Sequence, residues 1–395
     1  MSILKKLSIN DKAFIDEVWK KLDAKLSHVS VRSFNKLPYT AIDGVHDDKS
    51  LTDVNWWTNG FWPGIMWLLY SGTKCETYRK TAENGEKLLD EALKHHDELH
   101  HDVGFMWLLS SGASYQLTKN IESYTRTMYA ADVLAARYNI NGEFIRAWND
   151  GNGASDNRGW AIIDCMMNIP LLYWASFQTG DERYKYIAMK HADKTMKHHI
   201  REDGSVKHIV SYNPQNGDYI ENMGGQGYSA ESAWSRGQAW ALYGFALSYR
   251  YTGKEEYLNT AKRIAHYFIA NISEDYRPLA DFKAPQEPVI YDTTAGAIAA
   301  SGLLEIVQQV PDYERKIYYR AAINLLKVMD SEFCDYNVDT DAILHGGTER
   351  WLPKKEKSPG VHIPIIYGDY YFTEAIYKLK GFLPIFDLNK DMKVL

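Results

Sequence analysis

Cysteine is scarce in this chain of 395 residues. It has three cysteines, Cys75, Cys165 and Cys334, which lie far apart and form no Cys-x-x-Cys pair. An odd number of isolated cysteines is typical of a protein that stays reduced and has no disulfides. The sequence also lacks an apolar run long enough to cross a bilayer, and its first residues show no signal-peptide core. We therefore expect a cytoplasmic protein with no membrane contact.

An excess of basic residues is missing as well. The 45 basic and 51 acidic residues are well mixed and give a net charge of -6, which argues against a nucleic-acid partner. The abundant residues are aromatic, with 12 Trp, 28 Tyr and 13 Phe. Such rings stack on the faces of sugars, but they also fill large helical cores. Composition alone leaves both uses open.

Hydrophobic periodicity predicts twelve helices separated by loops. Pro170 either kinks one of these helices or marks its true first turn. The loop at 201–232 has an Asn-Gly turn at 216–217, which favours a short hairpin. The expected helices span residues 10–27, 61–71, 77–98, 103–117, 121–138, 160–179, 182–200, 233–252, 255–273, 292–309, 312–331 and 367–380.

Short and long connections alternate along these helices. Short turns near residues 72, 118, 180, 253 and 310 join a more apolar helix to the amphipathic helix that follows it. The sequence TGDERY at 179–184 is partly repeated as TGKEEY at 252–257. Repetition of this kind is typical of stacked helical hairpins. We predict an all-α fold, an (α/α)6 barrel in which residues 1–395 form a single domain; an open solenoid of hairpins is the alternative.

In such a barrel the long loops open on the face where the inner helices begin. One carboxylate expected there, Asp164, lies in the apolar run from Trp160 to Asn168, with no basic residue within five positions. An acid in an apolar setting suits general acid catalysis near neutral pH. The alternative is an Asp that braces a helix through backbone hydrogen bonds.

Other residues expected on this face would complete a site for an acidic sugar. Two carboxylates, Asp102 and Asp164, can divide acid and base work on a sugar, and Arg236 can grip a substrate carboxylate with two hydrogen bonds. The alternative is that the nearby tryptophans pack the rim and that Arg236 pairs with a structural acid.

A histidine cluster at His95, His96, His100 and His101 raises the question of a metal. His96 and His100 are four residues apart, a spacing that allows zinc. However, a solvated helix end is the commoner use of such a cluster, and the zincin context is absent. We therefore expect neither a metal nor a cofactor.

Five motifs carry a family resemblance. They are NWWTNGFW at 55–62, HDVGF at 101–105, IIDCMMN at 162–168, WSRGQAW at 234–240 and YGDYY at 367–371. Together, and in this order, they resemble the unsaturated glucuronyl hydrolases of glycoside hydrolase family 88. The resemblance implies a metal-free (α/α)6 barrel. It also implies hydrolysis of lyase-generated, glycosaminoglycan-type disaccharides, in which the enol ether of a 4,5-unsaturated uronic acid is protonated and hydrated.

The resemblance also assigns roles to residues. Asp164 matches the acid and base, and Asp102 matches a second essential Asp. His101 matches a neighbouring site position, and Trp234, which belongs to one of the five motifs, is also expected to bind the substrate. The positions that match substrate contacts are Trp57, Trp148, His208, Gln226, Arg236 and Trp240.

The chain departs from the family pattern in two places. Gly225 stands before Gln226 where a His is usual, and the loop before Tyr367 shows no clear sulfate-binding pattern. The sulfation preference therefore stays open. An unsaturated rhamnogalacturonyl hydrolase acting on pectin fragments is the alternative enzyme, and a non-catalytic glycan-binding module would need the tryptophans but not Asp164. We expect a monomer or homodimer.

Overall fold

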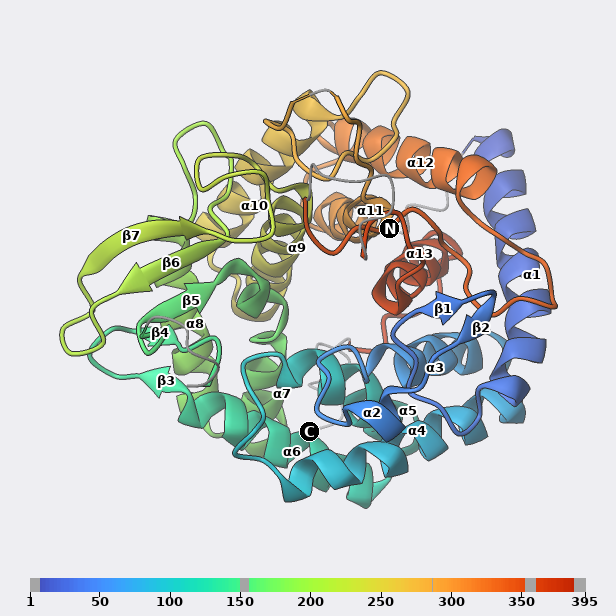
Figure 1. The fold of residues 1–395 in the computed structure, drawn as a ribbon, viewed down its shortest axis with the longest axis horizontal. Helices are drawn as coiled ribbons and strands as arrows, with labels where there is room; N and C mark the ends of the chain where they lie inside the picture. Colours follow the sequence, from blue (N-terminus) through green and yellow to red (C-terminus); the bar gives the residue numbers. More distant parts are fainter. Residues whose placement is uncertain (1–7, 150–155, 286, 352–359, 387–395) are drawn as a thin grey trace.

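Six inner helical segments surround the centre of the molecule, and six outer helices surround them (Figure 1). The computed structural model describes residues 8–149, 156–285, 287–351 and 360–386. The inner segments are α3 (Phe61–Thr73), η2 (Gly104–Gly112) with α5 (Ala113–Thr118), α7 (Pro170–Thr179), α9 (Ser235–Thr252), α11 (Thr293–Gln309) and α13 (Ile366–Leu379). The outer helices are α1 (Ile9–Arg32), α4 (Glu76–Lys94), α6 (Ile121–Ala136), α8 (Glu182–His198), α10 (Glu255–Asn271) and α12 (Arg315–Glu332).

Burial separates the two rings. Nearly every residue of α11, and most of α9, is buried, because these helices are enclosed on all sides. The outer helix α10 buries only one stripe, from Tyr257 to Phe268. A helix that is apolar all round belongs inside, and an amphipathic one belongs at the surface. The predicted assignment of inner and outer helices is confirmed.

The first outer helix closes the ring. The Trp19 ring of α1 lies 6.3 Å from that of Tyr377 in α13 and 5.1 Å from that of Phe382 just beyond it. Helix α1 also packs on α4 and α12. The two ends of the described chain therefore meet, and the (α/α)6 barrel is confirmed over the open solenoid.

The segment before Pro170 is not α-helical, which corrects the prediction of one helix over 160–179. Pro170 lies in the first turn of α7, so the second of the two expectations for this proline is confirmed. Upstream, β5 (Trp160–Ile162) pairs with β6 (Ile209–Tyr212), and a 3-10 helix, η3 (Ile163–Met167), follows. Because these backbone groups pair with a strand, they are unavailable to a helix.

Several short elements lie in the loops on the same face as β5. The predicted hairpin is confirmed as β6 with β7 (Tyr219–Gly224), and it forms a three-stranded antiparallel sheet with β5. The sequence did not indicate the pairs β1 (Ala41–Ile42) with β2 (Val45–His46) and β3 (Tyr138–Asn139) with β4 (Phe144–Ile145), nor helix α2 (Lys49–Thr52). Segment η2 is a π-helix rather than the expected α-helix.

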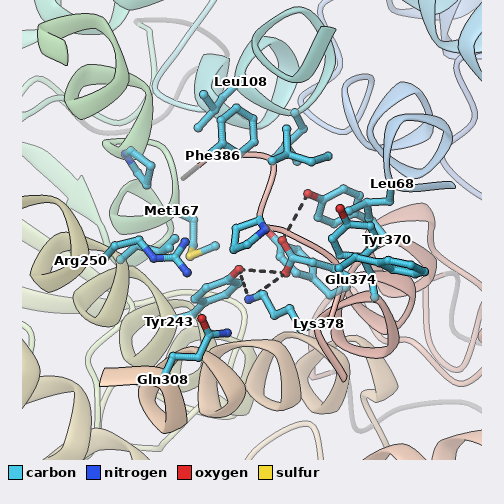
Figure 2. A pocket seen from close by; sticks show the side chains of 18 of the residues that line it. Leu68, Leu108, Met167, Tyr243, Arg250, Gln308, Tyr370, Glu374, Lys378 and Phe386 are labelled. Atoms are coloured by element: carbon cyan, nitrogen blue, oxygen red, sulfur yellow. Dashed lines mark hydrogen bonds and ion pairs between the residues drawn. The ribbon is translucent and has the colours of Figure 1, made fainter. Parts of the chain in front are cut away.

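The opposite end of the barrel holds a cavity of about 590 Å³ (Figure 2). A hydrogen-bonded charge cluster lies in its wall. Lys378 Nζ lies 2.6 Å from the hydroxyl of Tyr243, which donates to Glu374 at 2.9 Å. The carboxylate of Glu305, which is fully buried, pairs with Arg250 at 2.7 Å and with Lys378 at 3.5 Å. None of the candidate site residues lines this cavity.

Among the described residues, no helix is both long and apolar enough to cross a membrane.

Four of the five short turns between inner and outer helices share one backbone feature. Helices α3, α5, α7 and α9 each end at a left-handed residue, namely Lys74, Lys119, Gly180 and Gly253, with φ between 60° and 71°. This conformation costs a residue with a side chain about 1 kcal/mol and costs glycine little.

We therefore predict that Lys119→Gly raises the free energy of unfolding by about 0.5–1 kcal/mol. The matched control is Gly253→Ala, whose added Cβ would meet nothing within 4 Å, so that only backbone strain is tested. It should lower the free energy of unfolding by about 1 kcal/mol. Urea unfolding measures both variants, and an unchanged or lower stability of Lys119→Gly would contradict the expectation.

Candidate active site

A cavity of about 430 Å³ opens on the face where the inner helices begin. Eight of the ten candidate residues line it, and they come from the loops and short elements before α3, η2, α7 and α9 and from the first turn of α9. The lining is Tyr39, Trp56, Trp57, His100, His101, Asp102, Trp148, Ile162, Asp164, His208, Ile209, Gly225, Gln226, Arg236, Glu349, Arg350 and Tyr367.

Strand pairing positions the central acid. The backbone N–H of Ile163 donates to the carbonyl of His208 at 3.0 Å, which extends the β5–β6 ladder into η3. Asp164 is the next residue, so its carboxyl group lies beside the imidazole of His208, with Oδ1 3.7 Å from Nε2. This oxygen is buried and accepts no hydrogen bond from the described residues.

Burial decides the ionisation of Asp164. It raises the pKa of the carboxyl group to about 7, although the nearby charge of Arg236 acts in the opposite direction. Loss of solvation disfavours the charged form of an acid. At neutral pH, a large share of Asp164 is therefore protonated and can donate a proton into the cavity.

Asn168 links the carboxylate of Asp102 to the backbone of Asp164. Its side-chain NH2 group donates to Oδ1 of Asp102 at 3.0 Å and to the backbone carbonyl of Asp164 at 3.2 Å. Its carbonyl oxygen accepts from the backbone N–H of Phe105 at 2.8 Å. The contact is so close that a Cβ on Gly104 would lie 2.6 Å from Asn168. The sequence motif contains Asn168, but its role becomes visible only with these contacts.

The second acid lies beside two histidines. Burial and the charge of Asp164 raise the pKa of Asp102 well above its usual value. Oδ2 of Asp102 lies 3.3 Å from Nδ1 of His100 and 3.5 Å from Nε2 of His101. Burial lowers the pKa of His100 to about 4 and that of His101 well below 6.5, so both imidazoles are neutral at pH 7.

The tautomer of His208 follows from its neighbours. The backbone N–H of Gln226 donates to Nδ1 of His208 at 3.0 Å, and burial lowers the pKa of this imidazole. The single proton of the neutral ring therefore lies on Nε2, the atom that faces Asp164. Gly225 fits tightly against this ring. It has φ +142°, and an added Cβ would lie 1.9 Å from Nδ1, so position 225 admits no side chain in the conformation that this chain adopts.

The guanidinium of Arg236 is already paired. One guanidinium nitrogen, NH1, lies 2.6 Å from the carboxylate of Asp292 and donates to the carbonyl of Thr348. The other, NH2, donates to the carbonyl of Glu349 at 2.6 Å. The structural pairing considered from the sequence is therefore present, although Arg236 still lines the cavity.

Two predicted contact residues lie behind the cavity wall rather than in it. The Trp234 ring packs 4.3 Å from that of His208 and under the guanidinium of Arg236. Trp240 is fully buried, and its ring lies 5.2 Å from that of Phe105. Both belong to the predicted motif, but the start of α9 turns them toward the core, so they support other residues instead of lining the pocket.

Sequence reasoning missed Tyr39, His100, Glu349 and Arg350. The hydroxyl of Tyr39 donates to the carboxylate of Glu349, a residue 310 positions away. The backbone carbonyl of Glu349 accepts from the amide of Gln226 at 2.5 Å. No local pattern connects these positions, because only closure of the ring brings them together.

Comparisons with known proteins agree with this geometry. The family model for Glycosyl Hydrolase Family 88 matches residues 30–277. The chain is 38% identical over 335 residues to the unsaturated glucuronyl hydrolase of Bacillus sp. (strain GL1), covering 84% of this chain and 88% of the relative. It is 33% identical over 371 residues to the unsaturated chondroitin disaccharide hydrolase of Streptococcus pyogenes serotype M1, covering 92% and 91%.

Solved structures show the same fold. The unsaturated glucuronyl hydrolase of Bacillus sp. GL1 superposes with a TM-score of 0.84 at 34% identity, covering 92% of this chain and 97% of the other. The enzyme from Streptococcus agalactiae gives 0.86 at 28% identity, covering 96% and 94%. With a family match over more than half of its length and relatives that cover most of it, the chain belongs to glycosyl hydrolase family 88.

Proposed function

We propose that this enzyme hydrolyses lyase-generated, glycosaminoglycan-type disaccharides and releases the 4,5-unsaturated uronic acid from their non-reducing end. One observation carries the proposal, namely a buried carboxyl group at Asp164 whose pKa is about 7. An enol ether is cleaved by protonation at carbon, which needs an acid that is still protonated at working pH. Relatives of this chain are named unsaturated glucuronyl hydrolase and unsaturated chondroitin disaccharide hydrolase.

The proposed reaction begins at the double bond. Asp164 gives its proton to C4, and positive charge develops at C5 and the ring oxygen. The carboxylate that remains takes a proton from water as the water oxygen bonds to C5. The resulting hemiketal opens by breaking the bond between C5 and the ring oxygen. This step leaves a hemiacetal at C1, which expels the second sugar with its hydroxyl restored.

The neighbouring residues support this cycle through charge and position. The N–H at Nε2 of His208 faces the carboxylate that Asp164 becomes, so it stabilises that charge. Asp102 lies in the same cavity, and the charges of the two acids raise the cost of ionising both. We propose that Asp102 binds substrate hydroxyls, and that Trp57 and Trp148 offer ring faces to the sugars.

No step of this cycle calls for a group beyond side chains and water, so we propose that it runs without a cofactor. We also propose that the barrel acts as a single catalytic domain, as a monomer or homodimer, in the cytoplasm. The cysteines support a reducing compartment, because Cys75, Cys165 and Cys334 are all free thiols.

The test of the reaction follows the ultraviolet absorbance of the conjugated enol ether. Unsaturated chondroitin or hyaluronan disaccharide should lose this absorbance and release free amino sugar. A fall only with unsaturated rhamnogalacturonan disaccharide would replace the proposed substrate with the pectin-derived one. No change with any of these substrates would contradict the proposal.

We predict that Asp164→Asn lowers kcat by at least about 10³-fold, because the amide cannot donate the proton that the acid supplies. Substrate binding should persist, since the shape of the cavity is kept, and calorimetric titration with the disaccharide measures it. The matched control is Asp156→Asn, which alters a surface Asp beside Arg158 and should keep the native rate. Turnover near the native rate in Asp164→Asn would refute the role of this residue.

The pKa of Asp164 predicts the alkaline limb of the pH profile. Below pH 7 the proton needed at C4 is present, and above pH 7 it is lost, so kcat/KM should fall about tenfold per pH unit on the alkaline side. The stability of the native state changes with pH in the same direction, falling as the pH rises. The folded pKa exceeds the unfolded value of 3.8, so the native state loses stability as the pH rises from about 4 to about 7, and this loss is complete above pH 7.

Asp164→Asn should therefore melt at a higher temperature than the native protein at pH 8.5, with a smaller difference at pH 5.5. Thermal unfolding at the two pH values checks this. A kcat/KM that rises from pH 7 to 9, or a stability difference that is independent of pH, would argue against a protonated Asp164.

A further inference from the structure

The cavity contains a cluster of potential metal ligands that the proposed reaction does not explain. His100, His101 and Asp102 are consecutive residues at the entrance to η2. Each offers one ligand atom, and these three atoms lie within 4.8 Å of one another. His100 has no part in the proposed proton transfer, yet it lines the cavity beside the second acid.

Two of the three separations between these atoms match a tetrahedral metal site. Zinc bonds of about 2.0–2.1 Å place neighbouring ligand atoms about 3.3–3.5 Å apart. Oδ2 of Asp102 lies 3.3 Å from Nδ1 of His100 and 3.5 Å from Nε2 of His101. The ligand atoms of the two histidines are at most 4.8 Å apart, so metal binding would call for a small rotation of the His100 side chain, which is 25% exposed.

The ligands are held in place by their surroundings. Asn168 binds Oδ1 of Asp102 at 3.0 Å, which leaves Oδ2 directed at the histidines. The backbone N–H of His101 donates to the carbonyl of Ala147 at 3.1 Å. Metal-binding carboxylates are commonly oriented by such outer contacts. Three protein ligands on a cavity wall leave a fourth position open to water, as in exchangeable zinc sites.

Charge favours a cation here. Asp102 and Asp164 both line this cavity, and a dication there would offset negative charge on either acid. Arg137 is the opposing charge, and its guanidinium contributes to the low pKa values of both histidines.

We propose that His100, His101 and Asp102 form a binding site for Zn²⁺, and that zinc bound there inhibits the enzyme by occupying Asp102. The inhibitory part rests on the proposed function, whereas the binding part does not. The site differs from the pair indicated by sequence spacing, because His96 lies in an exposed turn after α4 and is not a member of the cluster.

The test is calorimetric titration of Zn²⁺ into the full chain, purified without a histidine tag and freed of metal with EDTA before buffer exchange. The native protein should bind one equivalent with a micromolar or lower Kd. His100→Ala should weaken this binding at least tenfold. The matched control, His96→Ala, removes a neighbouring exposed histidine and should bind zinc like the native protein.

Activity gives the second readout, with each variant compared with its own rate in the absence of zinc. Zinc should inhibit the native enzyme and His96→Ala, and EDTA should restore both. His100→Ala should require at least tenfold more zinc for the same inhibition. If circular dichroism shows that His100→Ala is unfolded, His100→Gln replaces it.

The outcomes separate the two proposals. Absence of zinc binding, or binding that depends on His96 instead of His100, would overturn the site. Zinc bound through His100 with no loss of rate would overturn the inhibition. One bound equivalent in a protein that turns over no unsaturated disaccharide would support the site and refute the proposed function.

Discussion

The active site depends on closure of the helical ring. Helix α1 packs through Trp19 against the residues around α13, and this contact brings the first and last parts of the described chain together. One wall of the cavity is built across that junction, where Tyr39 donates to Glu349. A ring of hairpins that did not close would still carry Asp102 and Asp164, but it would lack this wall. Stability of the fold and completeness of the site are therefore coupled.

Within the closed ring, two buried carboxyl groups impose the second constraint. Neither has a lysine or arginine bound directly to it among the described residues, and burial raises the pKa of both. Arg236 could have neutralised Asp164, but its guanidinium is held by Asp292 and backbone carbonyls. The fold thus keeps its strongest nearby cation engaged elsewhere, which leaves Asp164 able to hold a proton.

Much of this organisation could be predicted from the sequence, and the exceptions have physical causes. Alternating connections and apolar inner helices were sufficient for the barrel, because helix burial is a repeating, local signal. Strand β5 was misread as helix because its apolar run suits either structure, and only its partner β6 decides between them. The proline at position 170 was the local clue to the correct boundary.

The candidate site residues likewise divide into those that a local motif predicts and those that only the folded chain brings together. Several of those inside recognisable motifs, such as Asp102 and Asp164, do line the cavity. Trp234 and Trp240 belong to a motif but face the core, because a motif fixes the neighbours of a residue in sequence and not the side of the helix it occupies. Glu349 has no motif at all, and its place in the wall arises from a contact that spans most of the chain.

The π-helix η2 has a consequence for how this protein can change over evolution. It begins two residues after Asp102 and runs directly into α5. An i→i+5 turn holds more residues than an α turn, so such a segment can take up an inserted residue between two ends that stay in place. The number of residues in this segment can therefore change without moving the residues at its two ends. During evolution, this segment can gain or lose a residue in the centre of the barrel while Asp102, just before it, stays in the same position in space.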